Sequence, residues 1–343
     1  MIYRSVFIFC LLSTVLLTAC FKEDERIPPY DRGDKLTMVI EMTQNYKYQI
    51  YCNLDQNQVV STNLKRDMDL LFETSPASHY ILLNSANFMT ASATGKFSLD
   101  EVTSDAGLTH QFDPSSGNLD SLAIANWISI NGTDTTYSHE VFVIDRGYDE
   151  LGNLLGKKKI TFDSLVANRL YFTFANLNGS DLTSGMIAKT PESNFAYYSF
   201  NNEGLQVFPE PSKTSYDLLF SQYTTLLFTN EGIPYPYLVT GVLLNRFNTM
   251  VALDSITPFD SITLDMASEM AFSNQLDAIG YNWKDVIGDV ETGNVFYEVK
   301  PSYGYIIRNH EDMYFKLRFV NFYSTEGDSK GEKGYPTFEF QRL

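Results

Sequence analysis

Short runs of alternating or aromatic residues recur along most of the chain and predict β-strands. Glycine, asparagine, aspartate and proline separate the runs, and these residues favour turns. Such spacing is typical of an antiparallel sandwich or barrel. The predicted strands are Tyr46–Asn53, Val141–Ile144, Lys159–Leu165, Arg169–Leu177, Phe195–Phe200, Thr224–Phe228, Tyr237–Leu244, Asn294–Lys300, Tyr303–Arg308, Met313–Phe322 and Thr337–Gln341. We therefore expect an all-β fold.

Helical periodicity is clear in one place, Asp265–Leu276, and weaker in Leu64–Phe72. Apolar residues there recur every three or four positions, as on one face of a helix. The pattern predicts little helix in total.

The order of motifs in the first half of the chain returns in the second half. The matching pairs are Asn45–Asn53 with Asn194–Asn202, Asp69–Phe72 with Asp217–Phe220, Ile124–Trp127 with Ile279–Trp283, and Val141–Phe162 with Tyr305–Phe319. Four pairs in the same order indicate duplication. We expect two tandem antiparallel β modules, at residues 38–180 and 190–343.

Composition supports a folded, aromatic-rich and acidic protein. The chain has 343 residues, with 25 Phe and 22 Tyr, which exclude general disorder. Its 25 Lys+Arg against 42 Asp+Glu give a net charge of −17, which argues against binding nucleic acid.

The first residues read as a lipoprotein signal. The apolar run Val6–Leu17 follows Arg4 and is shorter than the roughly 20 residues that a membrane span needs. Leu17–Cys20 resembles a lipobox, which predicts cleavage after residue 19 and acylation of Cys20. Residues 1–19 are then the signal peptide and 20–37 a lipidated linker. An ordinary signal peptide with a chance cysteine is the alternative.

The residues directly after Cys20 carry a second signal. Lys22–Glu25 places one lysine and three acids behind the lipid, and resembles the export signal of Bacteroidota surface lipoproteins. It predicts an outer-membrane protein that faces the cell exterior. The alternative is a solvated charge run in a linker.

Candidate catalytic and metal-binding motifs are scarce. After processing, Cys52 is the remaining cysteine, and its apolar neighbours predict a buried thiol. The sequence has no CxxC, GxSxG, HExxH or phosphate-binding loop, so we expect neither a metal site nor an enzyme.

Several segments of the second half resemble the HmuY family, the Bacteroidota outer-membrane lipoproteins that include haem-binding haemophores. The resemblance is carried by Ser215–Phe220, Tyr237–Asn245, Ala278–Lys284 and Tyr305–Phe319. The first half shares it through the repeat. The resemblance implies a β fold and haem or a related nutrient as ligand. It also implies transfer of that ligand to a TonB-dependent receptor.

Axial haem ligands are normally His, Met, Cys or Tyr. The four histidines occupy no equivalent places in the two halves, so a pair of histidine ligands is not predicted. Met266 and Met270 lie four residues apart on one predicted helical face, where core packing is the competing role. Tyr235 and Tyr237 can stack on a flat ring or close a hairpin.

We expect the loops of the second module to hold any ligand, with Thr229–Leu238 and Asp265–Phe272 as opposite walls of an apolar cleft. The sequence leaves open a binding module for glycan or peptide, or a structural surface lipoprotein without a small ligand.

Overall fold

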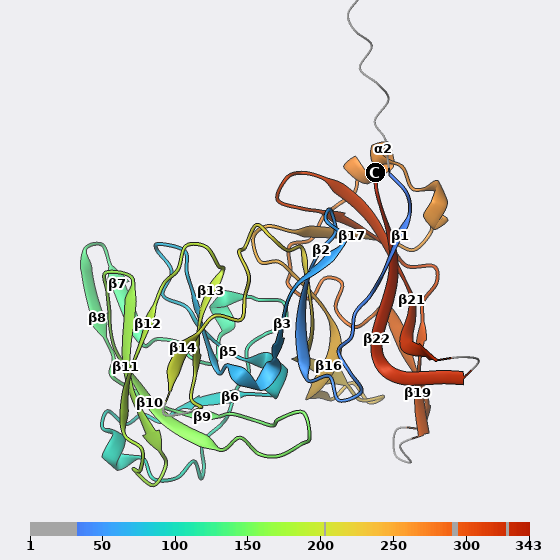
Figure 1. Cartoon of the computed structure of the whole chain (residues 1–343). Coiled ribbons are helices and arrows are strands. Elements are labelled where there is room, and N and C mark those ends of the chain that lie inside the picture. The colour runs from blue at the N-terminus through green and yellow to red at the C-terminus, as the bar shows by residue number, and fades with distance from the viewer. Residues whose placement is uncertain (1–32, 202–203, 290–293, 327–328) are drawn as a thin grey trace, which may run out of the picture. The chain divides into compact units, whose positions relative to one another are not determined.

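Antiparallel strands make up nearly all the regular structure that is described. The structure is a computed structural model, and it describes residues 33–201, 204–289, 294–326 and 329–343 (Figure 1). The predicted all-β fold is confirmed. The predicted signal peptide, Cys20 and Lys22–Glu25 lie outside the described residues.

The strands alternate with short connections and a few single helical turns. They are β1 (Leu36–Val39), β2 (Tyr48–Asn53), β3 (Gln58–Leu64), β4 (Leu70–Glu73), β5 (Ile81–Leu83), β6 (Thr90–Ala93), β7 (Ile128–Asn131), β8 (Asp134–Tyr137), β9 (Val141–Asp145), β10 (Lys157–Val166), β11 (Arg169–Asn176), β12 (Thr183–Ala188), β13 (Phe195–Ser199), β14 (Leu205–Val207), β15 (Leu218–Phe228), β16 (Pro234–Leu244), β17 (Met250–Asp254), β18 (Lys284–Asp289), β19 (Asn294–Val299), β20 (Gly304–Arg308), β21 (Tyr314–Glu326) and β22 (Ser329–Arg342). The helical turns are η1 (Lys65–Asp67), η2 (Ser85–Asn87), η3 (Leu99–Glu101), η4 (Leu119–Ser121), η5 (Phe259–Ser261) and α2 (Leu264–Ser268).

The first lobe, residues 66–210, contains a five-stranded and a four-stranded sheet. The strand orders are β12-β11-β10-β9-β6 and β14-β13-β4-β5. Alternate residues of these strands enter one apolar core, because successive side chains point to opposite faces of a sheet. Trp127, Phe172 and Tyr198 are among its large buried rings.

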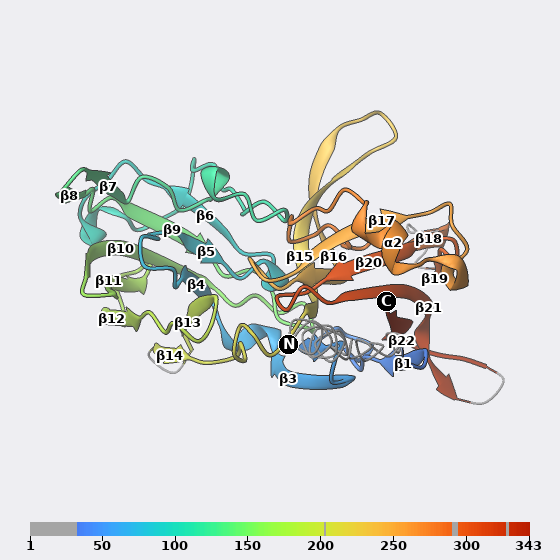
Figure 2. The ribbon, with the colours of Figure 1, turned by 90° about the horizontal axis from the view of Figure 1, so that it is seen from above.

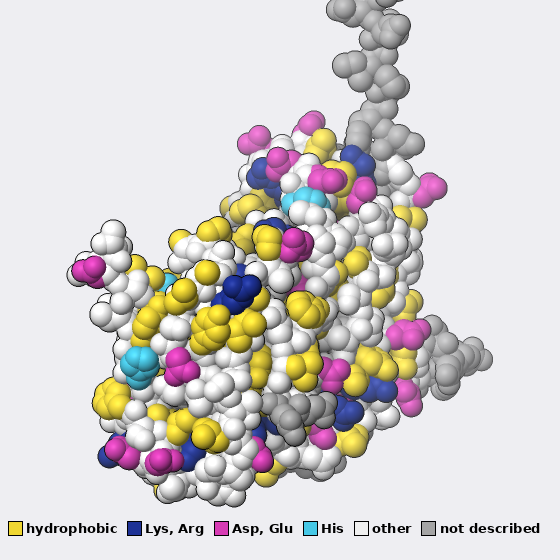
Figure 3. Space-filling model, turned by 60° about the vertical axis from the view of Figure 1, so that its left-hand side comes forward, with side chains coloured by type: hydrophobic (Ala, Val, Ile, Leu, Met, Phe, Trp, Pro, Cys, Tyr) yellow, Lys and Arg dark blue, Asp and Glu magenta, His cyan; other side chains and the backbone are white. Residues whose placement is uncertain are grey.

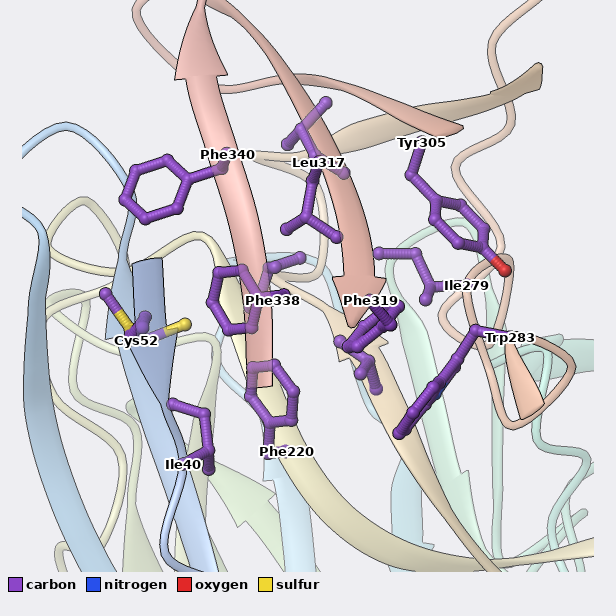
Figure 4. Packing of buried hydrophobic residues seen from close by; sticks show 14 of the residues in the cluster. Ile40, Cys52, Phe220, Ile279, Trp283, Tyr305, Leu317, Phe319, Phe338 and Phe340 are labelled. Atoms are coloured by element: carbon purple, nitrogen blue, oxygen red, sulfur yellow. The ribbon is translucent and has the colours of Figure 1, made fainter. Parts of the chain in front are cut away.

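The second lobe, residues 33–64 and 213–343, repeats this plan. Its sheets have the orders β1-β22-β21-β20-β17 and β3-β2-β15-β16, which match those of the first lobe strand by strand. Its core places Ile40 and Cys52 in one cluster with Phe220, Phe338 and Trp283 (Figure 4). Cys52 is fully buried, as predicted.

The first three strands of the described residues complete the two sheets of the second lobe. β1 pairs with β22 and β2 pairs with β15, although each pair is far apart in sequence. In the first lobe the corresponding strands, β12 to β14, follow directly after β11. The sheets thus join residues across the predicted modules 38–180 and 190–343. The predicted module boundaries differ from those of the two cores. The sequence repeat shows which segments are equivalent, but it does not show that the second lobe takes its first strands from residues that precede the first lobe.

The repeated Asp-Leu-Leu-Phe motifs occupy equivalent places in the two lobes. Asp69 and Asp217 both precede a strand whose Leu and Phe side chains enter the core. The Asp69 Oδ2 accepts a 2.7 Å hydrogen bond from Phe200 N, and the Asp217 Oδ2 accepts one of 2.7 Å from Leu54 N. The predicted duplication thus appears as shared hydrogen bonding as well as shared sequence.

The predicted strands are found, whereas the helices are shorter than predicted. α2 ends at Ser268, and Ser273 instead bridges Val251 across the sheet edge. The weaker helix prediction at Leu64–Phe72 is wrong for its second half, because β4 pairs with β13 on one side and β5 on the other. Pairing on both edges outweighs a local helical period.

Candidate functional site

A groove with a volume of about 480 Å³ lies beside the β15–β16 hairpin. We name it the tyrosine groove. Small-molecule sites commonly have volumes of roughly 300–1,000 Å³, so the groove is large enough for such a ligand. Its lining residues are Gln44, Asn45, Tyr46, Lys65, Phe88, Tyr148, Asp149, Glu150, Gly152, Gln222, Pro236, Tyr237, Leu238 and Lys333.

Aromatic rings from both lobes line the tyrosine groove. Tyr46 precedes β2 and Tyr237 lies on β16, both in the second lobe. Phe88 and Tyr148 come from loops of the first lobe. Tyr148 and Tyr237 are 43% and 49% exposed, so their ring faces are available to a ligand. Flat ligands are held well by such faces.

Close contact between two loops fixes the position of Tyr148. Its backbone N donates a 2.9 Å hydrogen bond to Asn87 O, next to Phe88. Glycine at position 147 allows the two loops to lie this close, since a Cβ there would be only 1.9 Å from Asn87 O. The φ of +69° at Gly147 also favours glycine.

A buried lysine supplies positive charge to the groove. Lys65 is 2% exposed, and its Nζ donates hydrogen bonds to Ala86 O at 3.2 Å and to Gln222 Oε1 at 2.6 Å. Burial lowers the pKa of Lys65 to about 8, so it is still mostly protonated at pH 7. Lys333 adds a second cation. Of the two acids in the wall, Glu150 is already paired with Arg66 at 2.9 Å.

This donor set suits a flat aromatic molecule that carries anionic groups. The phenol oxygens can bind a hard metal ion or donate hydrogen bonds, and the ammonium groups can bind carboxylates. The face seen in Figure 3 shows acidic and basic side chains interspersed among hydrophobic ones, without a continuous basic stripe.

Of the two tyrosines predicted as ligand contacts, one lines the groove and the other does not. Tyr237 lines it, whereas Tyr235 lies nearer the hairpin tip and is not in its wall. The two rings contact each other edge to face, with centroids 6.2 Å apart. Figure 2 shows their β15–β16 hairpin extending away from the neighbouring strands.

The predicted methionines lie elsewhere. Met266 is in α2 and is 43% exposed, and Met270 packs with Phe272 and Tyr314 against a small cluster that includes Ile306. Neither methionine lines the tyrosine groove. The structure thus does not bring them together with Tyr235 and Tyr237 as opposite walls of this groove. Their role as ligands stays a prediction.

The sequence pattern did not single out the other groove residues as ligand contacts. Tyr46, Lys65, Phe88 and Tyr148 are far apart in the chain and meet only because the two lobes meet. The sole local hint is Gly147, which stands in a run of charged residues immediately before Tyr148.

No group of three or more His, Cys, Asp or Glu side chains in the described part of the chain is arranged to hold a metal ion. No helix among the same residues is long and apolar enough to cross a bilayer.

Comparison with known proteins finds one family. The model of the family described as "HmuY protein" matches residues 45–340. No curated protein matches the chain significantly.

Several solved structures match the chain at low sequence identity, among them the following three. The apo HmuY analogue of Tannerella forsythia is 10% identical, with a TM-score of 0.26, over 92% of this chain and 99% of that one. Apo PinO of Porphyromonas gingivitis is 12% identical, with a TM-score of 0.18, over 46% and 100% of the two chains. A protein of Bacteroides vulgatus ATCC 8482, described as HmuY-like and haem-binding, is 15% identical, with a TM-score of 0.18, over 53% and 90%.

Proposed function

Because the chain belongs to the HmuY family, we propose that it is a binding lipoprotein whose tyrosine groove takes haem or a similar flat, anionic nutrient. The observation that carries this proposal is the groove itself. Exposed Tyr148 and Tyr237 and the buried cation of Lys65 meet there in a volume of about 480 Å³.

The groove fits haem by the chemistry of its side chains. Haem supplies an iron with open axial positions, and tyrosine oxygen is one of the known axial donors. Tyr237 and Tyr148 are the donors with exposed rings in the groove. Lys65 and Lys333 would hold the propionate carboxylates through charge-assisted hydrogen bonds.

The rest of the proposed role follows from the N-terminal signals. Acylation at Cys20 would anchor the protein to the outer membrane, and Lys22–Glu25 would send it to the outer surface. Delivery to a TonB-dependent receptor is the matching uptake step. We propose binding, without catalysis.

A haem titration of residues 21–343 tests the groove. Wild type should shift the Soret band with saturation at one equivalent. Tyr237→Phe keeps the ring but removes the oxygen, and should weaken binding at least tenfold or change the ligand-field bands of the ferric form. Tyr235→Phe is the matched control, because Tyr235 is on the same strand and outside the groove wall. It should behave like wild type.

Met266 and Met270 offer an alternative haem site to the tyrosine groove. If Met266→Ala/Met270→Ala abolishes the Soret shift and Tyr237→Phe does not, haem binds at α2 and the groove is not its site. If no variant and no wild type shifts the band, haem is not the ligand. A glycan-binding, peptide-binding or structural lipoprotein is then the better interpretation.

A further inference from the structure

A second cavity lies between the two lobes and is separate from the tyrosine groove. It has a volume of about 100 Å³. Its walls are mainly apolar and come from β4 and β5 of the first lobe and from β15 and β16 of the second. Leu71, Leu82, Leu219, Leu243 and Leu276 are among the side chains that line it.

One basic side chain also lines this cavity. Arg246 follows β16 and is 8% exposed. Its guanidinium lies over the rings of Phe195 and Phe247, at 5.7 and 4.7 Å from their centroids. Gly117 leaves room for it, since a Cβ there would lie 2.7 Å from Arg246 Nη1. The residue is thus held in place by its surroundings.

The guanidinium is short of acceptors. Its Nη2 donates a 3.2 Å hydrogen bond to Gly117 O, while its buried Nε has no hydrogen-bond partner. No carboxylate of the described residues lies within 4 Å of Arg246. The acid that acts on it electrostatically, Glu73, accepts hydrogen bonds from Ser75 and Ser78 instead. A buried cation without an anionic partner is costly, so the site favours an added anion.

The other polar side chains of the wall are already satisfied. Gln49 Nε2 donates to Ser221 Oγ at 3.0 Å, and Asn84 Nδ2 donates to Lys65 O at 2.6 Å. The Asp113 carboxylate accepts from Leu83 N and Ala123 N at 2.6 and 2.8 Å. Among the buried side-chain atoms of the lining, Arg246 Nε is the one without a partner.

We propose that the inter-lobe cavity binds a short aliphatic monocarboxylate of three to five carbons. The carboxylate would pair with the Arg246 guanidinium, and the alkyl chain would lie among the leucines. An apolar cavity of about 150 Å³ holds benzene, so a volume of about 100 Å³ suits a chain of this length. The apolar walls select against small inorganic anions, and the arginine selects against neutral alcohols and amines.

Calorimetric titration of residues 21–343 with sodium butyrate tests the proposal, and haem is absent throughout. Wild type should bind butyrate, and should bind 1-butanol and butylamine at least tenfold more weakly. Arg246→Met keeps the length of the side chain and removes the charge, and should weaken butyrate binding at least tenfold. Arg308→Met is the matched control, because Arg308 is more exposed and pairs with Asp312. It should bind like wild type.

A second variant covers the case in which Arg246→Met does not fold. Leu219→Phe keeps the arginine and reduces the cavity, and should weaken valerate binding more than propionate binding. Equal binding of butyrate and 1-butanol, or no detectable butyrate binding by folded wild type, would overturn the proposal. Neither outcome bears on haem in the tyrosine groove.

Discussion

The two lobes hold an equivalent buried aspartate in different ways. Asp69 and Asp217 are both 0% exposed, and each accepts a 2.7 Å hydrogen bond from a backbone N. In the first lobe Arg146 also binds the carboxylate, with its Nε 2.7 Å from Oδ1. In the second lobe no cation of the described residues lies within ion-pair distance of Asp217, and its buried Oδ1 has no hydrogen-bond partner among them.

This difference shows that the backbone hydrogen bond to the aspartate does not depend on the presence of an arginine counter-ion. Both lobes keep the bond that joins the Asp-Leu-Leu-Phe strand to its neighbour, whereas only the first has an arginine partner. Burial raises the pKa of both carboxyls, and in Asp69 the Arg146 charge opposes this effect. In Asp217, where burial is the largest cause, the pKa rises to about 6.

The largest effect is expected from removing the strands that complete the sheets of the second lobe. Residues 66–210 are one continuous segment, whereas 213–343 lack β1 to β3. We expect residues 65–212 to fold alone and residues 213–343 to remain without fixed tertiary structure, as measured by near-UV circular dichroism and urea unfolding.

A circular permutant is the control for that test. Gln341 Nε2 donates a 2.9 Å hydrogen bond to Gly33 O, so a short linker can join residue 343 to residue 33. The permuted segment 213–343 followed by 33–64 should fold cooperatively. If residues 213–343 fold equally well without 33–64, the closing role of β1 to β3 is wrong.

The second test removes the charge of each aspartate. Asp69→Asn leaves the Arg146 guanidinium buried without its carboxylate, and we expect a loss of about 3–5 kcal/mol in the free energy of unfolding. Asp217→Asn leaves no arginine without its carboxylate, so the loss in the free energy of unfolding should be less than about 1 kcal/mol. Urea unfolding at pH 7 measures both. Adding Arg146→Met to Asp69→Asn should restore part of the loss, and equal losses in the two single variants would contradict the comparison.

The third test uses pH. The folded pKa of Asp217 is about 6, and an unfolded aspartate titrates near 3.9. The folded state therefore binds this proton more tightly, so the contribution of Asp217 to stability falls as pH rises from about 4 to 6. Two pKa units correspond to about 3 kcal/mol at most.

Asp217→Asn should therefore gain stability relative to wild type between pH 4 and pH 7. Unfolding both proteins at the two pH values measures the gain. A stability difference that is constant with pH would show that Asp217 is ionised without cost in the fold.

The smallest test compares the equivalent tryptophans. Trp127 Nε1 donates a 3.0 Å hydrogen bond to His79 O, whereas the buried Nε1 of Trp283 has no partner. Replacement by phenylalanine should cost about 1 kcal/mol more at Trp127, because one hydrogen bond is lost there. Thermal unfolding of Trp127→Phe and Trp283→Phe measures the difference. A larger loss at Trp283 would mean that the shape of the core, and not the hydrogen bond, decides the effect.

The sequence predicted the parts of the fold that depend on local pattern. Alternation identified long strands such as β10 and β11 because their faces differ in burial. It missed β4, whose first three residues are all apolar, and β1, which is short and mostly exposed. The aspartate repeat pointed to real structural equivalence, because both copies make the same backbone bond.

The candidate site was predicted only at one residue. Tyr237 stood out in a run of tyrosine and proline, and it does line the groove. Lys65 and Tyr148 could not be found in this way, because each is brought to the groove by contacts between distant segments. Met270 was placed on a helical face, but nothing in the pattern shows that this residue packs against the cluster that includes Ile306.

The closing of the second lobe by β1 to β3 sets an order of events during synthesis. These strands are synthesised before the first lobe, whereas their partners β15 and β22 are synthesised after it. Met38, Ile40 and Ile50 must therefore remain uncovered while the whole first lobe emerges and folds. Over that interval the nascent chain carries an unpaired strand edge that another chain could bind. A chaperone that holds nascent chains would thus act on residues 36–64 until their partner strands arrive.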